Sequence, residues 1–208
     1  MKWARSAVSI FGELTSALLF ERSLADAIAS PENRLGASIR LAAETDLEFV
    51  CDLYVDDPWL WLGRSPQDRS AREHYLDRLR RGELCYIAMV DGRIAHVNWT
   101  CFSWGDALPG HPIKLRPSEI YTTDAMTVES FRGKGLHALV LSTMLREARE
   151  RGRRHAFTLG QIDRPEALKG LHALGWRECG RVTYFLPRGM TRTPFMYRRG
   201  MTEPLFRS

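Results

Sequence analysis

The sequence predicts an α/β (α+β) protein built on one mixed central β-sheet with flanking helices. Three observations support this expectation. The chain has 208 residues, of which 44% are hydrophobic and 26% charged, and this suffices for one buried core without disulfides or a metal ion. From residue 38 onward, stretches with strand alternation and stretches with helical periodicity follow one another. Near residue 130 a strand leads through a glycine-rich loop into a long amphipathic helix.

Charge and cysteine spacing limit the classes of function. The formal net charge is +5, but the 26 arginines and four lysines are scattered along the chain. A solvated surface explains such scatter better than a nucleic-acid site, so no nucleic-acid partner is expected. The cysteines form no C-x-x-C pair, which indicates neither a zinc site nor a disulfide framework; they are Cys51, Cys85, Cys101 and Cys179. We expect free thiols in a reducing cytoplasm, no metal, and no integral membrane segment, because no 18-residue window is continuously apolar.

The chain is expected to have three parts. Residues 1–37 form an N-terminal extension packed on the main domain. The apolar spacing over 1–16 predicts a helix, and residues 16–24 either continue it or form a short strand. Residues 38–187 form the main domain. The basic tail at 188–208 shows no regular period and is expected to pack on that domain.

Within the main domain, each element follows from a local pattern. Asp91-Gly92 between two β-rich runs predicts a hairpin turn. Asp163 and Glu166 form a capping box that begins a helix. Residues 104–117 are expected as a loop, because they hold two glycines and three prolines. The expected strands are 38–42, 85–90, 93–102, 119–128, 155–162 and 176–186, the last as one or two strands. The expected helices are 45–54, 67–81, a long one from 136 to just before Gly152, and 163–174.

The loop Arg132-Gly133-Lys134-Gly135 has the features of an anion site. The first N–H groups of a helix lack partners and carry a partial positive charge, so a phosphate binds well there. Glycines let the backbone approach the phosphate closely, and Arg132 and Lys134 add charge. A plain glycine-rich turn before a helix is the alternative.

Two other phosphate-loop patterns fit less well. A Walker loop needs Ser or Thr directly after the lysine, where this chain has Gly135. The dinucleotide pattern G-x-G-x-x-G/A is satisfied by Gly133, Gly135 and Ala138. Only one strand–helix unit follows it, however, which is too little chain for a second mononucleotide-binding half.

The pattern Arg132-x-x-Gly135-x-His137 resembles the R/Q-x-x-G-x-G/A pyrophosphate loop of the GNAT (Gcn5-related N-acetyltransferase) superfamily, whose members bind acyl-CoA. The order of elements over 38–186 and the L-G-W-x-E ending at 174–178 also resemble that family. The resemblance implies a GNAT-like mixed, splayed central sheet of six to seven strands.

The resemblance further implies acetyl-CoA as co-substrate, with no metal. In the family the fourth and fifth strands, here 119–128 and 155–162, open a cleft for the pantetheine arm. The backbone of Met126 and Val128 would pair with the pantetheine amides, and the Val128 N–H would hold the developing oxyanion. The cofactor-binding residues implied are Met126, Thr127, Val128, Arg132, Gly133, Lys134, Gly135, Leu136 and His137.

The chain departs from the family pattern at three positions. His137 replaces a small residue at the end of the loop, where it either packs or contacts the diphosphate. Arg164 stands where the family often has Asn. Leu171 stands where the family has the Tyr that protonates the departing thiolate, so the resemblance supplies no general acid.

Transfer to an amine requires a neutral nucleophile, and an alkyl ammonium has a pKa near ~10, so a base is useful. Glu119 is the candidate, because a Glu opens the same strand in the histone-acetyltransferase branch; a solvated residue at a strand start is the alternative. Asp124 is the rival base, with a salt bridge to an arginine as its alternative role. Tyr121 and Tyr184 are candidate acids, although tyrosines at the edge of a core are commoner than catalytic ones.

Together these patterns predict an acyl-CoA-dependent N-acyltransferase that transfers an acetyl group to a primary amine by direct attack in a ternary complex. Residues 16–24 resemble a segment of acetyltransferases of bacterial surface-polysaccharide assembly, which implies an amino sugar as acceptor. A non-catalytic CoA-binding module and a basic nucleotide- or nucleic-acid-binding domain are the alternatives. The expected partner is a small-molecule amine, and the sequence leaves a homodimer open.

Overall fold

A computed structural model describes residues 12–54, 71–102, 104–108, 111–187 and 195–199. Its strands are β1 (Gly12–Ser23), β2 (Ser38–Leu41), β3 (Leu84–Val90), β4 (Arg93–Cys101), β5 (Trp104–Leu108), β6 (His111–Lys114), β7 (Glu119–Thr127), β8 (His155–Gln161), β9 (Arg177–Pro187) and β10 (Phe195–Arg199). Its helices are α2 (Leu47–Tyr54), α3 (Ala71–Arg80), α4 (Leu136–Glu150) and α5 (Pro165–Ala173), with 3-10 turns at Glu44–Asp46 and Glu129–Phe131.

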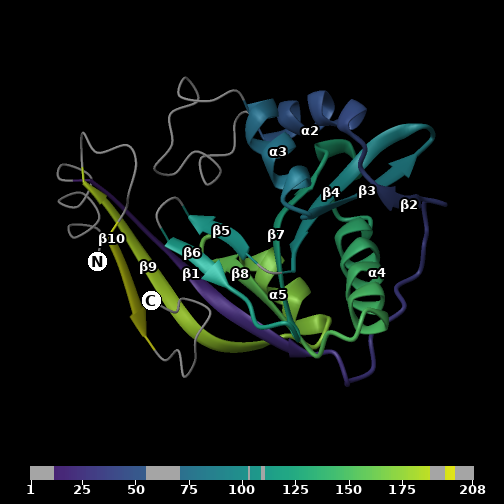
Figure 1. The fold of residues 1–208 in the computed structure, drawn as a ribbon. Coiled ribbons are helices and arrows are strands. Elements are labelled where there is room, and N and C mark those ends of the chain that lie inside the picture. The colour runs from purple at the N-terminus through teal and green to yellow at the C-terminus, as the bar shows by residue number, and fades with distance from the viewer. Residues whose placement is uncertain (1–11, 55–70, 103, 109–110, 188–194, 200–208) are drawn as a thin grey trace.

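The described strands form one eight-stranded sheet, in the order β10-β9-β1-β8-β7-β4-β3-β2, and a small sheet of β5 and β6 (Figure 1). In the large sheet β7 and β8 pair in parallel and the other neighbours pair antiparallel. The mixed sheet with flanking helices confirms the predicted fold class. The sheet has eight strands rather than six to seven, because β1 and β10 add to the predicted set.

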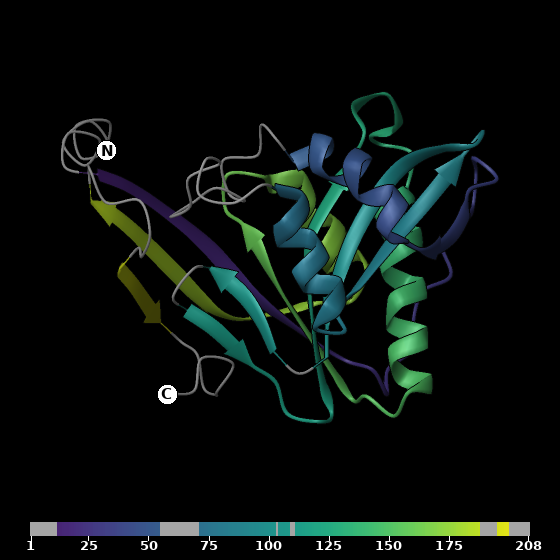
Figure 2. The ribbon, with the colours of Figure 1, turned by 45° about the horizontal axis from the view of Figure 1, so that its top comes forward.

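Helices cover both faces of the sheet, as the two views show together (Figures 1 and 2). Alternation along β3 sends successive side chains to opposite faces. Tyr86 and Ala88 join the core beneath α4 and α5, whereas Cys85 and Ile87 join the core beneath α2 and α3. Successive apolar residues of this one strand therefore pack against two layers of helices.

β1 lies inside the sheet, between β8 and β9, and not in an extension before the domain. The predicted helix is wrong for residues 12–16, which belong to this strand, while residues 1–11 lie outside the described ranges. Ala17 and Leu19 are buried in a third core cluster, together with Tyr121 and Tyr184, and Phe20 is buried in the core beneath α4 and α5. An unbroken apolar run is typical of a central strand that is covered on both faces, which explains the outcome.

Three further predictions are corrected. The expected loop at 104–117 contains a hairpin, since β5 and β6 pair antiparallel; the glycines and prolines that suggested a loop lie in and between two short strands. In the C-terminal tail, where no regular element was expected, β10 pairs with β9 and forms the sheet edge.

The capping box of Asp163 and Glu166 is not formed. The N-cap residue of α5 is Arg164, one residue later than expected, and the helix begins at Pro165.

The remaining predicted elements of the main domain agree with the structure to within a few residues. The β3–β4 turn is the clearest case: Asp91 and Gly92 both have positive φ, 48° and 74°, as a two-residue hairpin turn requires. Among the described helices, none combines the length and apolar character needed to cross a bilayer.

Candidate functional site

The parallel strands β7 and β8 separate partway along their length. Their pairing stops at Thr122 and Thr158, whereas the strands continue to Thr127 and Gln161. The Thr158 hydroxyl closes the paired part by donating to the Thr122 carbonyl at 2.8 Å. Beyond this point the sheet is open between the two strands, which is where the resemblance placed a cleft.

A bulge in β7 follows directly. Two residues of β7, Asp124 and Ala125, lie opposite the single residue Asn98 of β4, and such a bulge bends the strand. Asp124 has a φ of 50°, a left-handed conformation that is uncommon outside glycine. The Tyr54 hydroxyl of α2 donates to the Asp124 carbonyl and helps to hold this conformation.

The register of β7 decides which backbone groups face the opening. The Val128 N–H donates to the Ala95 carbonyl of β4 at 3.0 Å, and Met126 occupies the equivalent position two residues earlier. Because backbone groups alternate in direction along a strand, Thr127 faces away from β4. Consistent with this, the Thr127 carbonyl accepts a hydrogen bond from Arg132 Nε at 3.2 Å.

The predicted roles of Val128 and Met126 are therefore corrected. The Val128 N–H, expected to hold an oxyanion, is used within the sheet, and the backbone of Met126 also points toward β4. The backbone of Thr127 is the one that faces the opening. The predicted positions are one residue off, because the bulge at Asp124 and Ala125 changes which backbone groups of β7 point toward β4.

The loop before α4 has the geometry expected of an anion site. Gly133 and Gly135 have φ values of 72° and 82°, which glycine adopts most readily. A Cβ placed on either would meet no heavy atom within 4 Å, so the space beside the loop is open. The buried Leu136 begins α4, and the unpaired N–H groups of the first turn face this end of the helix.

Two adjoining cavities occupy this region. The larger has a volume of about 920 Å³ and lies over the loop and the first turn of α4. The smaller has a volume of about 170 Å³ and lies where β7 and β8 separate. They share Ala125, His137, Arg164 and Ala167. Of the predicted cofactor residues, those that line the larger cavity are Met126, Thr127, Arg132, Gly133, Gly135, Leu136 and His137.

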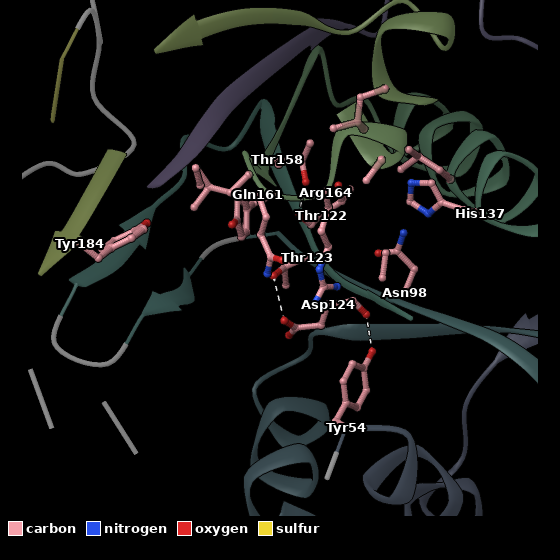
Figure 3. A pocket seen from close by; sticks show the side chains of 18 residues that line it. Tyr54, Asn98, Thr122, Thr123, Asp124, His137, Thr158, Gln161, Arg164 and Tyr184 are labelled. Atoms are coloured by element: carbon pink, nitrogen blue, oxygen red, sulfur yellow. Dashed lines mark hydrogen bonds between the residues drawn. The ribbon is translucent and has the colours of Figure 1, made fainter. Parts of the chain in front are cut away.

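The smaller cavity is lined from both faces of the sheet (Figure 3). Leu141 and Leu171 reach it from the core beneath α4 and α5. Tyr121 and Tyr184 reach it from the core on the other face. Leu171, which stands at the position of the family's catalytic Tyr, thus lines the cavity with an apolar side chain.

Glu119 lies at the paired end of β7 and lines neither cavity. Its carboxylate accepts the backbone N–H of Arg116 at 2.8 Å, and the Arg116 guanidinium lies 3.9 Å away. The five-residue step from Glu119 to Asp124 corresponds to about 16 Å along a strand. The geometry therefore argues against Glu119 as general base and gives it the role of closing the turn before β7.

Asp124 lines the smaller cavity, but its carboxylate is bound by Arg78 at 2.5 Å. Arg78 also binds Glu83 at 2.7 Å and stacks over Trp99 at 4.1 Å. Burial alone would lower the pKa of Arg78, but the two carboxylates outweigh it and hold that pKa well above its ordinary value. The salt bridge considered as an alternative for Asp124 is thus the arrangement found.

Tyr121 and Tyr184 line the smaller cavity, and Figure 3 shows Tyr184 at one side of it. Burial, together with the neighbouring Tyr184 and Asp124, raises the pKa of Tyr121 well above its ordinary value. The phenol of Tyr121 therefore keeps its proton at neutral pH and can donate a hydrogen bond.

A buried histidine, His96, and a partly exposed one, His137, line the larger cavity, and His137 lines the smaller one as well. The rings of His96 and His137 are 5.5 Å apart, and His96 Nδ1 lies 2.7 Å from Thr127 Oγ1. Burial lowers the pKa of His137 to about 4, and burial together with His137 holds the pKa of His96 well below its ordinary value. Both imidazoles are therefore neutral at neutral pH.

Sequence reasoning missed several residues of this site. Asn98 and Gln161 line the smaller cavity; a polar residue inside the apolar strand β4, and one at the end of β8, were the available signals. Tyr54 contacts Asp124 from 70 residues away in sequence, and Arg78 from 46 residues away. No local sequence pattern predicts contacts between residues so far apart. Within the described part of the chain, no group of three or more His, Cys, Asp or Glu side chains could hold a metal ion.

Comparisons with known proteins concern the fold. No protein-family model matches the sequence, and no curated protein matches it. A GNAT-family acetyltransferase from Colwellia psychrerythraea superposes with a TM-score of 0.58 at 14% identity, covering 89% of this chain and 61% of that chain. A protein described as an acetyltransferase of the GNAT family from Novosphingobium aromaticivorans gives 0.55 at 18% identity, covering 83% and 64%.

A third similar structure is named as a predicted acetyltransferase with acetyl-CoA from Clostridium acetobutylicum. Its TM-score is 0.50 at 16% identity, and the match covers 68% of this chain and 90% of that chain. This chain spans less than two thirds of the length of the Colwellia and Novosphingobium structures. The shared architecture gives one conclusion: the chain has the fold of the GNAT acetyltransferases.

Proposed function

We propose that this chain is an acyl-CoA-dependent N-acyltransferase that transfers an acetyl group from acetyl-CoA to a primary amine. The observation that carries the proposal is the pair of adjoining cavities, which lead from the α4 loop into the opening between β7 and β8. Further support comes from the fold, since a structure of the same fold is named as an acetyltransferase with acetyl-CoA.

The residues of the larger cavity fit a CoA donor. Open space beside Gly133 and Gly135 lets a diphosphate approach the first turn of α4, and the exposed Arg132 lies beside it. The backbone N–H of Thr127 faces the opening and can pair with an amide of the pantetheine arm. Acetyl-CoA supplies an activated thioester at the inner end of this path.

The transfer itself is a balanced exchange of bonds. The amine nitrogen forms a bond to the acyl carbon, the carbon–sulfur bond breaks, and the proton lost by the amine is balanced by protonation of the sulfur. Tyr121, whose phenol stays protonated because burial raises its pKa, is proposed to donate a hydrogen bond to the departing sulfur, in place of the Tyr that Leu171 replaces. The proton lost by the amine ends on that sulfur, so the products are an amide and a thiol.

The acceptor is proposed to enter from the face of the sheet that Tyr121 and Tyr184 line. An amino sugar remains the specific candidate, because the smaller cavity offers hydroxyl and amide groups for several hydroxyls; these are Asn98, Thr122, Thr123, Thr158 and Gln161. A cytoplasmic location, a homodimer and the absence of a nucleic-acid partner stay predictions.

Titration calorimetry with acetyl-CoA and with NADH tests the donor. We expect acetyl-CoA to bind and NADH not to bind. Arg132→Ala should weaken acetyl-CoA binding by roughly tenfold or more, since hydrogen bonds to charged groups contribute about 1.5–3 kcal/mol. The matched control is Arg149→Ala, which removes an exposed arginine from the last turn of α4, the helix that follows the loop. It should leave the affinity unchanged.

Thiol release in the presence of acetyl-CoA and an amine panel tests the reaction. The panel is glucosamine, a lysine-containing peptide and a simple alkylamine, and glucosamine is expected to be the best acceptor. Binding of acetyl-CoA without turnover of any amine would favour the non-catalytic CoA-binding module. Tight, salt-sensitive DNA binding without CoA binding would favour the basic nucleic-acid-binding alternative.

A further inference from the structure

Asn98 lies inside β4, where it pairs with Tyr86 of β3. It lies opposite the bulge at Asp124 and Ala125, where the strand pairing skips a residue. Asn98 is 1% exposed, and it lines the smaller cavity. Figure 3 shows its side chain beside that of His137, with the oxygen directed toward the middle of the pocket.

The side-chain oxygen of Asn98 has no hydrogen-bond partner among the described residues. Buried amide oxygens in folded proteins are normally paired. An unpaired one has lost its hydrogen bonds to water and has gained no hydrogen bond within the protein. Burial without a partner does not by itself assign a role: the hydroxyl of Thr100 in the same strand is also buried and unpaired, but Thr100 lines neither cavity. The smaller cavity has a second such oxygen, Gln161 Oε1 at the end of β8. Asn98 differs from Gln161 because it lies opposite the bulge of β7, where β7 and β8 separate.

The chemistry of the two proposed substrates selects a partner for this oxygen. A carbonyl oxygen accepts hydrogen bonds and cannot donate them. The reacting part of an acyl thioester offers a carbonyl oxygen and a sulfur, which are both acceptors. Of the two reacting groups, the amine nitrogen is the one that offers N–H donors, so it is the reacting group that can pair with Asn98 Oδ1.

We infer that Asn98 is a further catalytic residue: its side-chain oxygen accepts a hydrogen bond from the acceptor amine and thereby directs the nitrogen lone pair at the acyl carbon. The inference rests on the proposed function and adds a residue that orients the nucleophile. An amide does not take up a proton at neutral pH, so Asn98 contributes orientation.

Three variants test this role. Asn98→Leu removes the polar atoms and keeps a similar volume. Asn98→Asp keeps an acceptor oxygen and removes the amide donor. Thr100→Val is the matched control, because it removes a buried, unpaired hydroxyl from the same strand away from the cavities. For each, calorimetry with acetyl-CoA reports whether the fold and the donor site are intact.

Two readouts are then compared, using the amine of the panel that wild type acetylates best. The first is kcat/KM for that amine; the second is calorimetric binding of the same amine to protein saturated with CoA, where no reaction occurs. We expect Asn98→Leu to lower both by about tenfold, which corresponds to the loss of one hydrogen bond. Thr100→Val should leave both unchanged, and Asn98→Asp should lie closer to wild type than Asn98→Leu.

The inference is overturned if Asn98→Leu binds and acetylates the amine as well as Thr100→Val does. It is equally overturned if Asn98→Asp is as impaired as Asn98→Leu, because the amide N–H would then be the group that acts. Failure of wild type to bind acetyl-CoA or to acetylate any amine is a different result, since it removes the proposed function itself.

Discussion

At the scale of single residues, Arg78 explains why Asp124 is fixed. Its guanidinium joins Glu83 of the β3 side to Asp124 of the bulge and lies over the ring of Trp99. The Tyr54 hydroxyl holds the carbonyl of the same aspartate. Two helices, α2 and α3, therefore hold the one residue whose left-handed backbone bends β7 away from β8.

Replacing Arg78 should be costly. We expect Arg78→Met to lower the free energy of unfolding by about 3–5 kcal/mol, because the buried Glu83 loses one of its two arginine partners and the partly buried Asp124 loses its ion pair. Arg80→Met is the control: Arg80 is 66% exposed and pairs with Asp77 at 3.6 Å, and exposed pairs contribute about 0–1 kcal/mol. Urea unfolding followed by circular dichroism measures both, and equal losses would contradict the buried network.

Gly135 provides a second test at this scale. Gly135→Ala should lower the free energy of unfolding by about 1–2 kcal/mol, because its φ of 82° is strained for a residue with a Cβ. No neighbouring atom lies within 4 Å of that Cβ, so the effect isolates the backbone. Gly170→Ala in α5, which also has open space, should instead raise stability by about 0.5–1 kcal/mol. Chemical denaturation compares the two, and a shift of the same sign in both would refute the argument.

At the scale of elements, the sequence located most strands and helices, but it assigned residues 12–16 of β1 to a helix and left the rest of that strand open between a helix and a short strand. The residues that suggested a helix fall largely in 1–11, outside the described ranges, whereas Ala17 to Phe20 form an unbroken apolar run. Local periodicity cannot separate a short buried helix from a buried strand. Pairing with β8 and β9, more than 130 residues away in sequence, decides the matter.

The central place of β1 is testable. Phe20 is fully buried, and Phe20→Ala should lower the free energy of unfolding by about 3–5 kcal/mol. Leu14 lies in the same strand but is 55% exposed, and Leu14→Ala should stay within about 0.5 kcal/mol of wild type. Thermal and urea unfolding measure both variants. A strand outside the core would instead make Phe20→Ala as mild as Leu14→Ala.

At the scale of the whole molecule, His96 and His137 link stability to pH. In the unfolded chain both have a pKa near ~6.5, whereas in the folded protein burial lowers the pKa of His137 to about 4 and holds the pKa of His96 well below its ordinary value. Below pH ~6.5 the unfolded chain binds protons that the folded protein does not, so stability falls as the pH is lowered toward about 4.

The slope of stability against pH measures this effect. His137→Gln should reduce the loss of stability between roughly pH 7 and pH 5, since it removes one of the groups concerned. His155→Gln, at an exposed position on β8, should leave the slope unchanged. Urea midpoints at several pH values give the comparison. An unaltered slope in His137→Gln would mean that this imidazole is not held neutral by the fold.

The sequence by itself determined the mixed sheet with flanking helices and the Gly133–Gly135 loop at the start of α4, because these depend on local periodicity and on glycine's backbone freedom. The tertiary structure decided which groups meet in the opening. The Val128 N–H pairs with the Ala95 carbonyl and so does not serve as the expected oxyanion donor. Glu119 lies outside the two cavities. The tertiary structure also brought Asn98 to the smaller cavity. These outcomes depend on one bulge and on contacts between distant strands, and no stretch of sequence contains both partners of such a contact.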